Sequence, residues 1–213
     1  TVQGANWVGG LIGDTLSTGF VESCYSLSDV TGGTNVGGLV GWSERPINMC
    51  HAYGDVSGVT STGGLAGVSG WAIANCSASG HVTGTNTPTG GLVGWNGADI
   101  LYSNSSSIVS GTNSVGGLVG QHASGDIMHC NATGDVTGSD IRVGGLVGNF
   151  DAGLISDCFA VGDVTGQGTV GGLVGTLDGG AVTDSYATGE VTSPPGYAGG
   201  FVGWAHLGGT INN

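Results

Sequence analysis

Apolar residues recur along this chain in a frame of about 27 positions. A Gly-Gly pair followed by two apolar residues and a further glycine begins at eight places: Gly9, Gly37, Gly63, Gly90, Gly116, Gly144, Gly171 and Gly199. The intervals between successive pairs are 26 to 28 residues. Self-similarity at such a period indicates a repeat protein in which each repeat forms one structural unit.

Within each repeat the residues alternate as they do in a β-strand. An unbroken valine column comprises Val30, Val56, Val82, Val109, Val136, Val164 and Val191. Small residues such as Cys50 and Ala52 stand two positions apart, with a polar residue such as His51 between them. Successive side chains of a strand point to opposite faces, so the small residues are predicted inside and the polar ones outside. No stretch shows a helical period of useful length.

This pattern predicts an all-β chain, a parallel β-helix or β-solenoid that forms a single domain over residues 1–213. About eight right-handed coils, each with about three short strands, would stack about 4.8 Å apart into a rod about 38 Å long. Each coil would contact only its neighbours. We expect the glycines at turns where φ is positive.

The charge balance excludes several classes of partner. Charged residues make up 8% of the chain, the formal net charge is −13, and Arg45 and Arg142 are the only basic residues besides histidines. Such a surface cannot neutralise a row of phosphates, so we expect no nucleic-acid partner. No apolar run approaches the roughly 20 residues of a membrane span, so we expect no membrane insertion.

Catalytic groupings are also missing from the pattern. Some parallel β-helices cleave acidic polysaccharides, but that chemistry needs clustered basic residues, and the two arginines fall about four coils apart. The histidines are spread along the chain without metal-ligand spacing: His51, His81, His122, His129 and His206. We therefore expect a protein that is not an enzyme and that has no metal centre of this kind.

Five cysteines occupy one inward column of the repeat: Cys24, Cys50, Cys76, Cys130 and Cys158. Ser103 and Ser185 take the same position in other coils, and a buried free cysteine behaves as a small apolar residue. The column predicts a reduced packing ladder. The alternative is one or two disulfides between adjacent coils, whose Cα spacing would fall in the disulfide range.

Two outward rows suggest ligands of different kinds. The acidic row reads Asp29, Asp55, His81, Ile108, Asp135, Asp163 and Glu190. Its carboxylates are expected to accept turn N–H groups or to face water, and the alternative is bound Ca²⁺. The hydroxyl row reads Thr31, Ser57, Thr83, Ser110, Thr137, Thr165 and Thr192, and a flat hydroxyl array resembles an ice-binding face.

Two further sets of outward residues are candidate sites. Trp42, Trp95 and Trp204 share one column, where they would either stack on sugar rings of a glycan or cover bare glycine backbone. The sequons at Asn75, Asn104 and Asn131 are candidate glycosylation sites that should point outward.

The motif Gly-Gly-Leu-Val-Gly, at residues 37–41, 90–94, 116–120, 144–148 and 171–175, resembles the GLUG repeat. That motif occurs in bacterial and archaeal surface proteins, including adhesins and the non-catalytic region of some immunoglobulin A peptidases. The resemblance implies a β-helical stalk or adhesive region at the cell surface or outside the cell. Peptidase activity is not implied, because the chain has no His-Glu-x-x-His.

Both ends of the sequence fall inside a repeat, since Val2 stands seven residues before Gly9 as Val30 stands seven before Gly37. This predicts either an excised stretch of a longer protein or a subunit that stacks end to end with copies of itself in a filament. The leading hypothesis is an extracellular structural or adhesive module. The alternative is a surface module that binds a glycan or, less favoured, ice.

Overall fold

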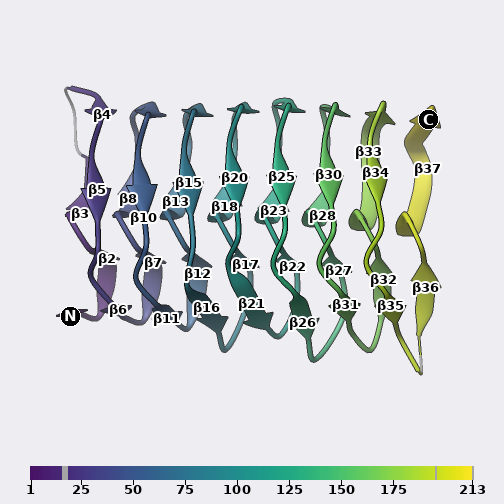
Figure 1. Ribbon diagram of the computed structural model, residues 1–213, viewed down its shortest axis with the longest axis horizontal. Helices are drawn as coiled ribbons and strands as arrows, with labels where there is room; N and C mark the ends of the chain where they lie inside the picture. The colour runs from purple at the N-terminus through teal and green to yellow at the C-terminus, as the bar shows by residue number, and fades with distance from the viewer. Residues whose placement is uncertain (16–18, 195, 213) are drawn as a thin grey trace.

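The computed structural model describes residues 1–15, 19–194 and 196–212, which form a straight stack of coils with one chain end at each end of the rod (Figure 1). The regular elements within these ranges are all β-strands, and the pairs between successive coils are all parallel. The prediction of an all-β parallel solenoid with about eight coils is confirmed.

The strands form four sheets that run along the rod. The first contains β1 (Val2–Gln3), β6 (Val30–Thr31), β11 (Val56–Gly58), β16 (His81–Gly84), β21 (Ile108–Gly111), β26 (Val136–Gly138), β31 (Val164–Thr165) and β35 (Val191–Thr192). The second contains β2 (Asn6–Gly9), β7 (Thr34–Gly37), β12 (Thr60–Gly63), β17 (Thr89–Gly90), β22 (Val115–Gly116), β27 (Val143–Gly144), β32 (Thr169–Gly171) and β36 (Tyr197–Gly199).

The third sheet consists of two ladders that merge in the long strand β33. One ladder contains β3 (Ile12–Asp14), β8 (Val40–Ser43), β13 (Ala66–Ser69), β18 (Val93–Asn96), β23 (Val119–His122), β28 (Val147–Phe150), β33 (Val174–Thr183) and β37 (Val202–Asn212). The other contains β4 (Val21–Glu22), β9 (Ile47–Asn48), β14 (Ile73–Ala74), β19 (Ile100–Leu101), β24 (Ile127–Met128) and β29 (Leu154–Ser156). The fourth sheet contains β5 (Tyr25–Ser26), β10 (His51–Ala52), β15 (Ser77–Ala78), β20 (Asn104–Ser105), β25 (Asn131–Ala132), β30 (Phe159–Ala160) and β34 (Tyr186–Ala187).

A typical coil therefore has five short strands, β6 to β10 for example, and the expectation of about three was too low. The reason is a corner that the hydrophobic pattern does not reveal. Met49 separates β9 from β10 and has a left-handed backbone, with φ at 51°. The same corner recurs at Ser23, Asn75, Tyr102, His129, Asp157 and Asp184. Each left-handed residue divides a run that reads as one strand into two.

The glycine pairs serve close approach of the coils, and the expectation of positive φ at the glycines was mostly wrong. Five described glycines have a left-handed φ, and none of the five belongs to the eight Gly-Gly pairs of the repeat. A Cβ on Gly37 would overlap the carbonyl oxygen of Val40. A Cβ on Gly38 would overlap the carbonyl oxygen of Gly64 in the next coil. Since backbone cannot yield as a side chain can, these positions require glycine.

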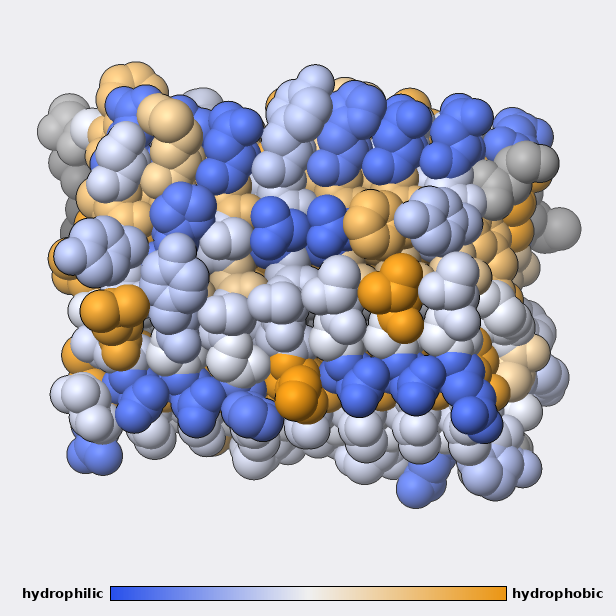
Figure 2. Space-filling model, in the orientation of Figure 1, coloured by the Kyte–Doolittle hydropathy of each residue, from blue (hydrophilic) through white to orange (hydrophobic). Residues whose placement is uncertain are grey.

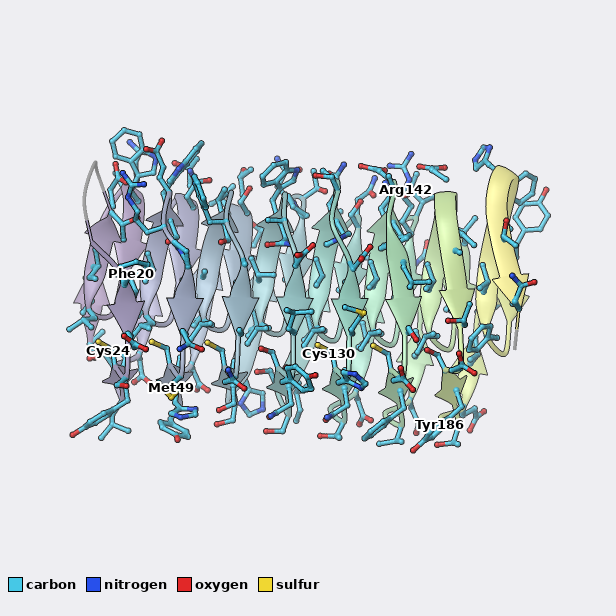
Figure 3. The ribbon with its side chains drawn as sticks, turned by 90° about the horizontal axis from the view of Figure 1, so that it is seen from above. Phe20, Cys24, Met49, Cys130, Arg142 and Tyr186 are labelled. Atoms are coloured by element: carbon cyan, nitrogen blue, oxygen red, sulfur yellow. The ribbon has the colours of Figure 1, made fainter. Side chains whose placement is uncertain are left out.

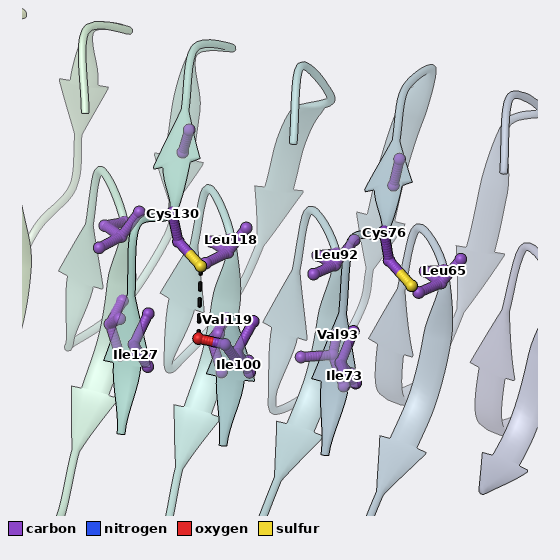
Figure 4. Close-up of a cluster of buried hydrophobic side chains, with 14 of the residues drawn as sticks. Leu65, Ile73, Cys76, Leu92, Val93, Ile100, Leu118, Val119, Ile127 and Cys130 are labelled. Atoms are coloured by element: carbon purple, nitrogen blue, oxygen red, sulfur yellow. Dashed lines mark hydrogen bonds between the residues drawn. The ribbon is translucent and has the colours of Figure 1, made fainter. Parts of the chain in front are cut away.

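The core has two parts. The larger lies between the third and fourth sheets, where leucine, isoleucine and valine meet the small cysteine and alanine columns (Figure 4). The smaller lies between the first and second sheets and consists of valines alone, in two groups, one around Val36 and one around Val143. Thr62 and Thr89 take the place of valine in the second sheet between these groups. The rod is thus filled along its whole length by side chains.

Candidate functional site

The outward residues form long rows, because equivalent residues of successive coils pair in register. Figure 2 shows one face of the rod on which residues of like hydropathy line up along its length. The valine column illustrates the register, since Val30 pairs with Val56 and Val56 with Val82. The columns predicted from sequence are therefore spatial rows, and each candidate can be located on the rod.

The acidic row is exposed, and its carboxylates accept backbone N–H groups as expected. Asp55 Oδ1 accepts from the N–H of His81 at 2.8 Å, and Asp163 Oδ1 accepts from that of Glu190 at 2.8 Å. Asp29 and Asp135 make the same contact with the next coil, at 3.2 and 3.0 Å. Each bond joins one coil to the next. Among the described residues no group of three or more His, Cys, Asp or Glu side chains is arranged to hold a metal ion.

The hydroxyl row is outward, as predicted, with all members exposed except the half-buried Thr192. The hydroxyl row is one residue wide, because the other outward neighbour of each inward valine belongs to the acidic row. Val30 points inward between Asp29 and Thr31, for example. This face of the rod therefore carries a line of hydroxyls next to a line of mostly acidic residues, and not a flat array of hydroxyls.

The tryptophan column shares one register but is interrupted. Val68 stands between Trp42 and Trp95, and Gln121, Asn149 and Thr176 stand between Trp95 and Trp204. Trp42 and Trp95 are half-buried. The ring of Trp95 lies over Gly97, where an added Cβ would come within 2.7 Å of it, and Trp42 packs edge-on against Trp7. The ring of Trp95 thus covers glycine backbone, and Trp204, 40% exposed, is the most accessible of the three.

All five cysteines are free, and four are buried. Figure 3 shows Cys24 and Cys130 on the same line along the rod. Cys130 Sγ donates to the carbonyl of Ile100 at 3.4 Å (Figure 4). Cys76 Sγ donates to the carbonyl of Ile47 at 3.5 Å, and each acceptor lies one coil back. The hydrogen bond with Cys50 and then burial raise the pKa of the Cys76 thiol, and the bond with Cys158 and burial do the same for Cys130. The expected reduced ladder agrees with this arrangement.

The three sequon asparagines lie on the outside of the fourth sheet or at its corner. Asn75 is exposed with a left-handed φ of 54°, and its side chain donates to Asn48 Oδ1 at 3.0 Å. Asn104 is exposed and Asn131 half-buried, and the two pair directly in neighbouring coils. A glycan on one would therefore stand beside the other.

The histidines have separate roles. His81, His129 and His206 are exposed, each within 4 Å of an aspartate, and His51 bonds Ser77 at 2.7 Å. His122 is buried, and burial lowers the pKa of its imidazole. These positions do not bring two histidines together around one centre.

Sequence reasoning missed a groove near the last coils that brings Arg142 close to Tyr197 and Trp204. It also missed stacked ring pairs on the outer surface, such as Tyr102 with His129 and Phe159 with Tyr186. The ring pairs could have been found from the repeat frame, since their members fall in one column. The groove could not, because its residues come from different columns.

Comparisons with known proteins identify the repeat. A family model described as the GLUG motif matches residues 111–137, 139–165 and 166–192. Neither a curated protein nor a solved structure matches the chain. In the described residues no helix is present that could cross a membrane.

Proposed function

Because this chain is a GLUG-repeat β-solenoid, we propose that it is a rigid module of the cell surface or extracellular space, with a structural or adhesive role and no catalytic activity. The observation that carries the proposal is the unbroken register of the coils. From Val2 to Val191 every coil places valine on the same inward line, with an outward residue on each side. Such a regular rod is suited to presenting rows of outward side chains and to holding the structures attached to it at a fixed separation.

The surface chemistry supports a partner other than nucleic acid or the membrane interior. Arg45 and Arg142, the only Lys or Arg residues of the chain, stand on coils far apart and cannot neutralise a row of phosphates. For catalysis, the exposed histidines face single aspartates on separate coils, as His81 faces Asp55. This dispersion favours a binding or structural role over an enzymatic one.

Location and adhesion are tested on the source cells. An antibody against the chain should label intact cells as strongly as permeabilised ones, and the purified chain should bind the surface of cells that lack it. Labelling that requires permeabilisation would contradict the surface location. Surface labelling without adhesion would leave the structural role and remove the adhesive one.

End-to-end stacking is the second part of the proposal. In the last described strand Ala205 continues the inward line of Leu177 but is exposed, so a further coil could pack against it. Electron microscopy and light scattering of the 213-residue chain should show fibres whose axial repeat is about 38 Å. Ala205→Lys should abolish them, while Gln167→Lys, on an exposed outward position, should not. Monodisperse short rods from the unmodified chain would refute the filament.

Glycan binding is the second candidate function, and the exposure of Trp204 favours it. Retention on a glycan column that is lost in Trp204→Ala but kept in the half-buried Trp42→Ala would support it. Ice binding is less favoured, because carboxylates flank the hydroxyl row, and absence of crystal faceting in an ice-shaping assay would remove it. We also propose that the exposed sequons at Asn75 and Asn104 are glycosylated in a competent host, which intact mass before and after glycosidase would detect.

A further inference from the structure

A groove of about 280 Å³ opens on the rod where the second and third sheets adjoin near the last coils. Its walls include Arg142, Thr169, Tyr197, Trp204 and His206. Tyr197 pairs with Thr169 and Trp204 with Thr176 of the preceding coil, so the two rings stand beside two threonines. Arg142 projects from the long face opposite to the one that carries Tyr186 (Figure 3).

Arg142 contributes the positive charge of the groove. Its backbone N–H donates to Thr169 Oγ1 at 3.2 Å, and that hydroxyl lies 3.0 Å from Thr176 Oγ1. These bonds hold the left-handed backbone of Arg142, with φ at 63°, at the edge of the groove. Within the described ranges of the chain, no carboxylate lies within ion-pair distance of its guanidinium. The groove is unusual because it contains one of the only two arginines of a chain that has no lysine and a net charge of −13.

The aromatic rings form the apolar part of the groove. Tyr197 and Trp204 lie edge to face with centroids 5.1 Å apart, and they are 63% and 40% exposed. His206 lies edge to face with Trp204 at 5.9 Å, and its Nε2 is 3.2 Å from Asp178 Oδ1. The rings support one another, so their outward faces are held in place and remain open to a ligand.

We propose that this groove binds a carboxylated sugar, such as a uronic acid unit of an acidic polysaccharide. The C–H face of a pyranose ring would pack on Trp204 or Tyr197, and its carboxylate would receive paired N–H donors from Arg142. Hydroxyls of the sugar would meet Thr169 and His206. The proposal deepens the adhesive role and rests on it for its biological setting, but the binding site itself can be tested separately.

Calorimetric titration of the full chain with trigalacturonic acid and with the neutral trisaccharide of galactose tests the site. The acidic trisaccharide should bind at least tenfold more tightly, because only its carboxylates engage Arg142. Its affinity should fall as salt is added, since an exposed charge pair is screened. Equal affinity for the two sugars, or no binding of the acidic one, would overturn the proposal.

Variants assign the contacts. Arg142→Gln should reduce the affinity for the acidic trisaccharide by about tenfold or more, to the level of the neutral one, while Trp204→Ala should abolish binding of both. Arg45→Gln and Trp42→Ala, which change the same residue types outside the groove, should bind as the unmodified chain does. Unfolding curves establish that each variant is folded. Unchanged affinity in a folded Arg142→Gln variant would refute the site. Surface labelling that persists when sugar binding fails would leave the structural role standing.

Discussion

Asn96 and His122 occupy the same inward position in successive coils, and Asn96 Nδ2 lies 3.1 Å from His122 Nδ1. His122 Nε2 lies 3.0 Å from the carbonyl oxygen of Gly125, which can only accept, so Nε2 carries the proton. Nδ1 of the neutral ring then accepts from the Asn96 amide. A second proton on the ring would face that amide donor inside the core.

We predict that the free energy of unfolding decreases as the pH falls below about 6.5, the usual histidine pKa. Burial lowers the pKa of folded His122, while Asp151, Asp99 and Asp126 oppose that shift. Between the folded and unfolded pKa values the unfolded chain binds the additional proton, so stability is lost by up to about 1.4 kcal/mol per pH unit. Denaturant unfolding at a series of pH values measures the slope.

The matched variant is His122→Asn, since asparagine stands at this position one coil earlier. It should cost about 1–2 kcal/mol at neutral pH, because the stacking on Phe150 at 5.1 Å is lost and the side chain is smaller. Its stability should depend less on pH below 6.5. An unchanged slope would show that other groups cause the acid sensitivity.

Thr62 and Thr89 interrupt the valine line of the second sheet, and their buried hydroxyls have no hydrogen-bond partner. We predict that Thr62→Val and Thr89→Val each stabilise the chain by about 1 kcal/mol, because valine has nearly the same shape and removes an unsatisfied polar group. Thermal and denaturant unfolding would measure the gain. Thr83→Val, in an exposed position, is the control and should change stability little.

Gly64 stands where its coil meets the next. An added Cβ would overlap the carbonyl oxygen of Gly91 and come within 2.9 Å of the Ala78 Cβ. Gly64→Ala should therefore cost about 3 kcal/mol or more, since backbone must move. Gly70→Ala is the comparison, because its nearest atom, Ser43 O, would be 3.9 Å away. Similar unfolding midpoints for the two variants would contradict the close approach of the coils.

The cysteine ladder predicts a particular thiol count. Without reductant, the denatured chain should titrate five thiols, whereas the native chain should react slowly and first at Cys24, which is half-buried. A lower count after denaturation would indicate disulfides between coils. Cys76→Ser should cost only about 1 kcal/mol, because Ser103 fills the equivalent position and its hydroxyl bonds the Cys76 N–H at 3.1 Å.

Asp163 stands between Asp135 and Glu190 in the acidic row. Asp163→Asn keeps an oxygen for the Glu190 N–H and removes a charge between two others, so at low salt we expect equal or slightly higher stability. Asp163→Ala removes the acceptor and should cost about 0.5–1 kcal/mol. The unfolding midpoint should be the same with calcium and with chelator. A large rise with calcium would instead assign a cation to the row.

The sequence alone determined the columns of this protein. Because successive coils stack in register, residues one repeat apart become neighbours, as Val30 is to Val56, and periodicity is enough to predict them. The acidic row, the cysteine ladder and the interrupted tryptophan column all follow from this translation along the rod.

Only the tertiary structure decided how the columns lie relative to one another across a coil. Left-handed corners such as Met49 set the number of strands, and no hydrophobic pattern marks them because the residue there points outward whatever its type. The path of the backbone from the second sheet to the third brings Arg142 and Trp204, from different columns two coils apart, into one groove. Lateral proximity depends on the path of the backbone around the coil, which a repeat period does not contain.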